Sequence, residues 1–132
     1  MTQLCLSPAG TVTRSYSGFT PRQRFLDSKP EDWRKQIDIG LYGVLNVCHA
    51  ALPHMIANKS GRILNLAGDS ARVGESGLSV TAASRGGVIA WSKSIAKEHG
   101  RDGITANVLS LGLVETSHTD PAWLAANRDR IL

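Results

Sequence analysis

The feature that most constrains this chain is a strand pattern with helical patterns on both sides. Residues 63–67 form an apolar run with one interruption, as expected of a parallel strand buried on both faces. Apolar residues recur at spacings of three and four from Trp33 to Met55, and a similar spacing recurs over residues 79–99. This alternation of strand and helix periods predicts an α/β protein with a parallel sheet.

Capping and turn signals predict where the helices begin and end. Ser28-Lys29-Pro30-Glu31 predicts a helix that begins with Ser28 as its cap, and Gly100 marks the end of the second long helix. The predicted elements are strands at 4–6, 63–67 and 104–109, long helices at 28–57 and 79–99, and a short helix from residue 120. Residues 1–132 are predicted to form one truncated domain, with a short strand and an irregular loop over 1–27, a core over 28–116 and a short C-terminal helix over 117–132.

The order of these elements predicts where the helices lie. If the three strands lie side by side in sequence order, right-handed crossovers place both long helices on one face of the sheet. The other face is then bare, and two sheet edges are unpaired. An incomplete domain of this kind predicts that the chain oligomerises, adopts an atypical arrangement or is poorly soluble.

Composition excludes several classes of protein. The net charge of +4 comes from 15 basic and 11 acidic residues with no basic patch, so no nucleic-acid partner is predicted. Cys5 and Cys48 have neither a second cysteine nor a histidine at metal-ligand spacing, which predicts no metal site and reduced thiols in a cytoplasmic protein. The apolar runs fall short of the roughly 20 residues that span a bilayer, so no membrane segment is predicted.

Several segments resemble the short-chain dehydrogenase/reductase family. They are PEDWRKQIDI, LYGVLNVCHAALPHMI, GRILNLA, GGVIAWSKSIAKEHGRDGITANV and residues 112–116, and the similarity runs from about residue 26 to 116. It is strongest to 3-oxoacyl-carrier-protein reductases and alicyclic hydroxyacyl-CoA dehydrogenases. The resemblance implies a partial Rossmann-like, doubly wound sheet of about three strands with two long helices, lacking the N-terminal dinucleotide-binding half. It also implies hydride transfer between NAD(P) and a carbonyl or alcohol carbon.

The residues that do this chemistry in the family are replaced here. Ungapped alignment places Thr81 at the catalytic tyrosine, Arg85 at the lysine, Gly68 at the serine and Gly40 at the asparagine. In the family the tyrosine moves the proton, the lysine lowers its pKa, the serine polarises the carbonyl and the asparagine anchors a water of the proton relay. A threonine hydroxyl has a pKa well above the tyrosine value of about 10, and it cannot act as this base near neutral pH. The resemblance therefore implies a catalytic site with none of its four groups intact.

The cofactor site is also incomplete in the sequence. No Gly-x-Gly-x-x-Gly turn follows a predicted strand, so a phosphate cradle is missing. Gly112 and Thr116 align with family positions next to the cofactor, and Arg85 aligns with the lysine that holds the nicotinamide ribose. NAD(P) is implied by the resemblance alone, and its binding to this chain is doubtful.

Three hypotheses follow. The first is a non-catalytic protein that pairs with itself or with an intact relative through the helices at 30–57 and 79–99. The second is a weak NAD(P)-dependent oxidoreductase for a hydroxyacyl, oxoacyl or other carbonyl substrate, with Ser70 or Asp69 substituting for the lost groups. The third is a chain with no selected function. The four replacements argue against an enzyme without excluding one.

Overall fold

A parallel two-stranded sheet forms the centre of the computed structural model. The structure describes residues 3–7, 10–14, 20–112, 121–122 and 124–126. Strand β3 (Gly61–Gly68) pairs in parallel with β4 (Ile104–Leu111), and the connection between them contains α3 (Ser70–Val73), α4 (Ser79–His99) and the 3₁₀ turn η3 (Gly100–Asp102). The predicted strands at 63–67 and 104–109 and the predicted helix at 79–99 are confirmed. Residues 121–122 and 124–126 are helical, as predicted for the C-terminal segment.

The predicted helix over residues 30–57 is one continuous helical run with a wider turn in it. Helix α1 (Pro30–Ile37) leads into the π-helical segment η2 (Asp38–Tyr42), which leads into α2 (Gly43–Ala57). The predicted capping role of Ser28 is wrong, because Lys29 is the N-cap. The Ser28 hydroxyl instead donates to the Phe25 carbonyl at 2.6 Å and accepts from Trp33 Nε1 at 2.6 Å. These bonds support a stacked Phe25–Trp33 pair beside the 3₁₀ turn η1 (Phe25–Asp27).

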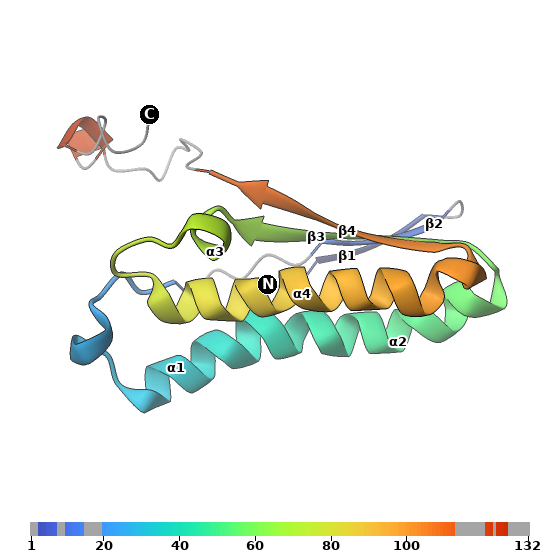
Figure 1. Ribbon diagram of the computed structural model, residues 1–132, viewed down its shortest axis with the longest axis horizontal. Coiled ribbons are helices and arrows are strands. Elements are labelled where there is room, and N and C mark those ends of the chain that lie inside the picture. Colours follow the sequence, from blue (N-terminus) through green and yellow to red (C-terminus); the bar gives the residue numbers. More distant parts are fainter. Residues whose placement is uncertain (1–2, 8–9, 15–19, 113–120, 123, 127–132) are drawn as a thin grey trace.

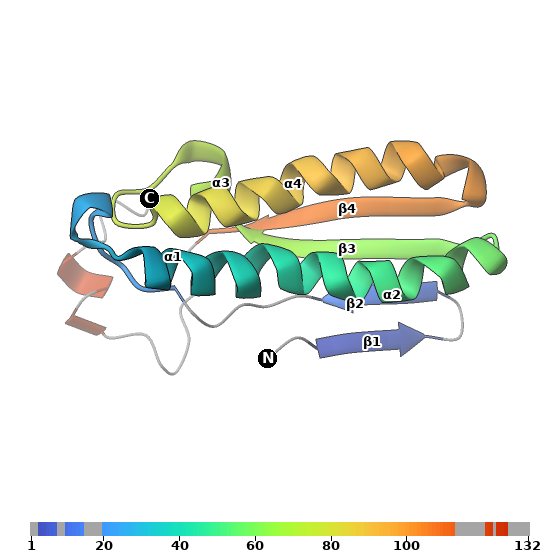
Figure 2. The same ribbon diagram turned by 90° about the horizontal axis from the view of Figure 1, so that it is seen from below.

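The N-terminal segment differs from its prediction. Strands β1 (Gln3–Ser7) and β2 (Gly10–Arg14) form an antiparallel hairpin, and β2 lies beside β3 (Figure 2). The predicted strand at 4–6 exists, but its place as a third strand of the parallel sheet is wrong, and part of the predicted loop is β2. The physical reason is local: Gly-Thr-Val-Thr-Arg is rich in β-branched residues. An antiparallel partner also needs only a tight turn, whereas a parallel one needs a crossover of a dozen or more residues.

The long helices lie on one face of the β3–β4 sheet, and the described part of the chain leaves the other face open (Figure 1). The core between sheet and helices is formed by Val44, Cys48, Ala51, Met55, Ile63, Val88, Ile95 and Ile104. Along β3 burial alternates, with Ile63, Asn65 and Ala67 buried. Leu64 is 39% exposed and Leu109 is 48% exposed, so β3 is not covered on both faces. The predicted bare face is confirmed for the described residues.

The run Pro30–Ala57 is long and apolar enough to cross a membrane by length and composition alone. It has 28 residues and a mean hydropathy of 1.3 in its most apolar window. Core helices of soluble proteins meet the same criteria, and Val44, Cys48 and Met55 of this run pack in the core. The absence of a membrane segment remains a prediction.

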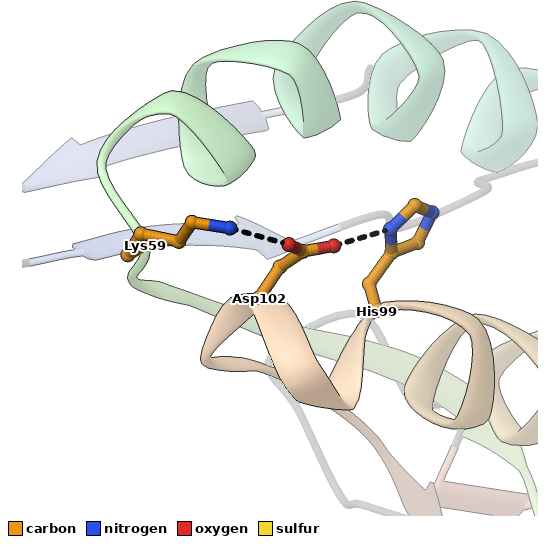
Figure 3. A network of polar contacts seen from close by, with 3 residues as sticks. All are labelled: Lys59, His99 and Asp102. Carbon is orange, nitrogen blue, oxygen red and sulfur yellow. Dashed lines mark hydrogen bonds and ion pairs between the residues drawn. The ribbon is translucent and has the colours of Figure 1, made fainter.

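Three polar side chains tie two turns together at the amino ends of β3 and β4 (Figure 3). Lys59, in the turn before β3, places Nζ 2.8 Å from Asp102 Oδ1, and His99 Nδ1 lies 3.3 Å from Asp102 Oδ2. The hydrogen bond from Lys59 and then that from His99 lower the pKa of the Asp102 carboxyl below its ordinary value of 3.8. The network therefore stabilises the folded protein while Asp102 is ionised.

This lowered pKa predicts how stability changes with pH. The contribution of Asp102 is fully present above pH 3.8, the value in the unfolded chain, and is lost as the pH falls through the lower folded value. Asp102→Asn removes the titrating group, so its deficit in unfolding free energy is expected to be largest near neutral pH and to shrink below pH 3.8. Urea unfolding of both proteins across the acid range measures this deficit. A deficit that stays constant with pH would contradict the ion pair.

Candidate functional site

Two of the four replaced catalytic positions meet at the carboxyl end of β3. Gly68 ends the strand, and Arg85 reaches it from α4. A Cβ atom on Gly68 would lie 3.1 Å from Arg85 Nη1 and 3.3 Å from Ser70 Oγ. The guanidinium and the Ser70 hydroxyl thus converge on the space where the family's serine would begin. Neither Gly68 nor Arg85 offers a hydroxyl, and the guanidinium does not reproduce the compact ammonium group of a lysine.

Thr81 serves the packing of two helices. It is 5% exposed, and its hydroxyl donates to Gln36 Oε1 of α1 at 2.7 Å. Gln36 is itself buried, and its backbone carbonyl accepts a second bond from Ser84 Oγ at 3.4 Å. A buried amide oxygen needs such a partner, because leaving it unpaired costs free energy. The hydroxyl at the family's tyrosine position is therefore used to hold α4 against α1.

Gly40 lies in η2, the single wide turn between α1 and α2. Such π-helical turns are rare and occur often at functional positions. A glycine there has no side chain to anchor a water, which is the role the resemblance gives to an asparagine. Gly40 therefore lies in an irregular turn of the helix but carries no side chain for that role.

Asp69 and Ser70, the candidate substitutes for the lost catalytic groups, lie next to Gly68. Asp69 already has partners. Its Oδ1 atom lies 2.9 Å from Arg72 Nη1 and accepts from Ser110 Oγ at 3.3 Å. Its backbone N–H donates to the Leu111 carbonyl at 2.8 Å, which joins the ends of β3 and β4. These contacts describe a structural acid. Ser70 is half-buried at the start of α3, with its hydroxyl beside the Gly68 site.

The described residues do not form a cradle for NAD(P) phosphates. β3 ends at Gly68 and is followed by Asp69-Ser70, and β4 ends at Leu111 next to an exposed Gly112. Neither turn carries the spaced glycines that let a backbone approach a pyrophosphate. Thr116 lies outside the described residues. Within the described ranges, no three His, Cys, Asp or Glu side chains gather as metal ligands.

Sequence reasoning missed two buried polar residues. Gln36 follows Trp33 by three positions on the stripe that faces the core, and a polar residue there was the available signal. Asn65 interrupts the apolar run of β3, and it is fully buried with Nδ2 donating to Ser92 Oγ at 3.0 Å. Its Oδ1 atom has no partner among the residues that the structure describes. Gln36 joins α1 to α4, and Asn65 joins β3 to α4. Neither of these bonds involves a residue of the Gly68 site.

Comparisons with known proteins identify the family of this chain. Residues 12–130 match the family described as Enoyl-(Acyl carrier protein) reductase. The chain is 34% identical over 103 residues to a 3-oxoacyl-[acyl-carrier-protein] reductase of Chlamydia pneumoniae, and 35% identical over 104 residues to one of Synechocystis. These matches cover 78% and 79% of this chain and 42% of each relative. The chain belongs to the short-chain dehydrogenase/reductase family.

Solved structures show the same fold. A gluconate 5-dehydrogenase from Burkholderia cenocepacia, in complex with NADP and tartrate, matches with a TM-score of 0.79 and 29% identity, over 88% of this chain and 49% of that one. A short-chain dehydrogenase from Streptomyces avermitilis matches with a TM-score of 0.77 over 91% of this chain and 49% of that one; at 19% identity this shows the fold alone. The chain spans about half the length of these two proteins. It spans 42% of the length of the two 3-oxoacyl-[acyl-carrier-protein] reductases.

Proposed function

We propose that this chain is a non-catalytic member of its family that acts by pairing with a second copy or with an intact relative. The surface for this pairing is the outer side of the run Pro30–Ala57 together with α4. The observation that carries the proposal is the exposure of this run: only 22% of its most apolar window is buried within the chain.

Large apolar side chains mark the exposed side of the run. Tyr42 is 54% exposed and Ile39 is 38% exposed, and both lie in η2. Exposed apolar side chains that gather on one surface can mark protein–protein contacts. A partially exposed aromatic residue is also the residue type enriched at the centre of interfaces. These two exposed side chains support a pairing surface on the helices.

The state of the catalytic positions supports the non-catalytic half of the proposal. Thr81 is engaged with Gln36 inside the packing of α1 and α4, and Gly40 and Gly68 have no functional groups. Losing one positioned acid or base costs about 10²- to 10⁴-fold in rate. Such losses do not add simply, but the loss of all four groups leaves little of the family's acceleration.

Sedimentation velocity of the wild-type chain and of Tyr42→Glu tests the pairing. The wild type is expected to sediment as a dimer or larger species, and Tyr42→Glu to dissociate at least about tenfold more readily, because an unpaired charge would be buried. Val73→Glu is the matched control, since Val73 is 71% exposed on α3, away from the helix run. A wild-type chain that is folded by circular dichroism and strictly monomeric would overturn the proposal. Equal dissociation of both variants would show that the interface does not lie at Tyr42.

A further inference from the structure

The carboxyl end of β3 has two hydrogen-bond donors where the family's catalytic serine would lie. Arg85 Nη1 and Ser70 Oγ both lie within 3.3 Å of the point that a Cβ on Gly68 would occupy. They come from different elements, α4 and α3, and Figure 1 shows both helices beside the end of β3. In open α/β sheets the crevice outside the carboxyl ends of the strands is where ligands bind.

The glycine and the arginine at this site depend on each other. A Cβ on residue 68 would lie 3.1 Å from Arg85 Nη1, which is tighter than an ordinary contact, so the absence of a side chain lets the arginine lie over the strand end. A guanidinium carries five N–H donors in a rigid fork, which matches the geometry of carboxylate and phosphate oxygens. The same group can therefore keep its other contacts and still donate to an added anion.

The two acids between β3 and α4 are each paired with a cation. Asp69 is the adjacent acid, and its Oδ1 atom is engaged by Arg72 at 2.9 Å and by the Ser110 hydroxyl at 3.3 Å. Farther along the same loop, Glu75 is paired with Arg22 at 2.6 Å. Asp69 and Glu75 thus each have a cationic partner of their own. Hydrogen bonds from a charged donor to an anion are about twice as strong as neutral ones.

We propose that Arg85 and Ser70, placed over Gly68, form a binding site for a small oxyanion, a carboxylate or a phosphate. The guanidinium supplies the charge and paired donors, the hydroxyl supplies one more donor, and the missing side chain of Gly68 lets the guanidinium lie over the strand end. A catalytic position of the family has become an anion-binding position in this chain. The site requires no cofactor and no hydride transfer.

Titration with sodium acetate and with inorganic phosphate at constant ionic strength, followed by amide chemical shifts, tests this site. Saturable shifts are expected at the amides around residues 68–70, and Arg85→Gln is expected to weaken binding at least about tenfold. Gly68→Val keeps every charge and should weaken binding comparably, because its side chain displaces the guanidinium. Ser70→Ala should weaken binding severalfold and provides a second readout if another variant does not fold.

Arg62→Gln is the matched control, since Arg62 lies on the same strand at its other end, where it donates to the carbonyls of Gly61 and Gly103. It makes the same change of charge and should leave the affinity within about twofold. Equal weakening by Arg62→Gln would assign the shifts to net charge and overturn the site. Absence of saturation with both anions, or full binding by Gly68→Val, would overturn it as well. Saturation by only one of the two anions would support the site and identify its ligand as a carboxylate or a phosphate.

Discussion

Gly103→Ala is expected to destabilise the folded protein by more than about 4 kcal/mol, a large share of the stability of an ordinary domain. Gly103 has φ +75, and an alanine Cβ there would lie 2.2 Å from the Lys59 carbonyl oxygen. The backbone of residue 103 fixes the position of this Cβ, and the Lys59 oxygen is itself a backbone atom, so no side-chain rotation relieves the clash. The left-handed conformation adds about 1–2 kcal/mol for a residue with a Cβ.

The close approach at Gly103 holds the amino ends of the sheet together. Its N–H donates to the Gly100 carbonyl at 3.1 Å, and its own carbonyl accepts from the Gly61 N–H at 3.3 Å. The same carbonyl accepts from Arg62 Nη1 at 3.2 Å. A shift of the backbone that relieved the clash would therefore disturb the first pairing of β3 with β4, beside the Lys59–Asp102–His99 network in Figure 3.

Urea unfolding followed by circular dichroism measures the effect, with Gly100→Ala as the control in the same turn. A Cβ added to Gly100 would meet no described atom within 4 Å, and the φ of Gly100 is −59. Its replacement is expected to be neutral or to stabilise by up to about 1 kcal/mol, because alanine restricts the unfolded chain. Equal stability of the two variants would show that η3 and the turn before β3 are not in contact.

Thr81→Val is expected to cost about 1–3 kcal/mol of unfolding free energy. Valine has almost the shape of threonine but no hydroxyl, so Gln36 Oε1 would lose its 2.7 Å bond inside the α1–α4 contact. Thr81→Ser keeps the hydroxyl and should recover part of the loss. Thr105→Val is the exposed control on β4, and it should change stability by less than about 0.5 kcal/mol.

The shift of the urea midpoint at unchanged slope gives these differences. A Thr81→Val protein as stable as Thr105→Val would mean that the Thr81 hydroxyl is free in solution and remains available to a ligand. The expected loss would instead assign the family's tyrosine position to helix packing. The Thr81 series therefore separates a structural role from a retained catalytic one.

The sequence predicted the parts of the fold that depend on periodicity. The stripes before and after β3 located both long helices, and the apolar run located β3 itself, because these patterns reflect burial directly. The hairpin of β1 and β2 was missed, because a short β-branched run beside prolines and glycines reads equally as strand or loop. The cap at Ser28 was wrong because its hydroxyl is engaged by Trp33 Nε1 and the Phe25 carbonyl, a contact that spacing does not reveal.

The candidate site could be predicted only as a set of replaced positions. Alignment placed Gly68 and Arg85 at family positions, but their mutual approach depends on how α4 crosses the end of β3. The engagement of Thr81 by Gln36 spans 45 residues of sequence. This hydrogen bond depends on how α1 packs against α4, so the sequence of either helix alone does not reveal it.

The most direct test of the proposed loss of catalytic function is a titration of the chain with NADH and NADPH, followed by tryptophan quenching and energy transfer to the dihydronicotinamide. The tryptophans of the chain, Trp33 and Trp91 among them, supply the emission. We predict no saturable binding up to millimolar cofactor and no energy transfer, because the described strand ends lack a phosphate cradle. Saturable binding at micromolar cofactor would contradict this prediction and would restore an NAD(P)-dependent oxidoreductase as the function to pursue.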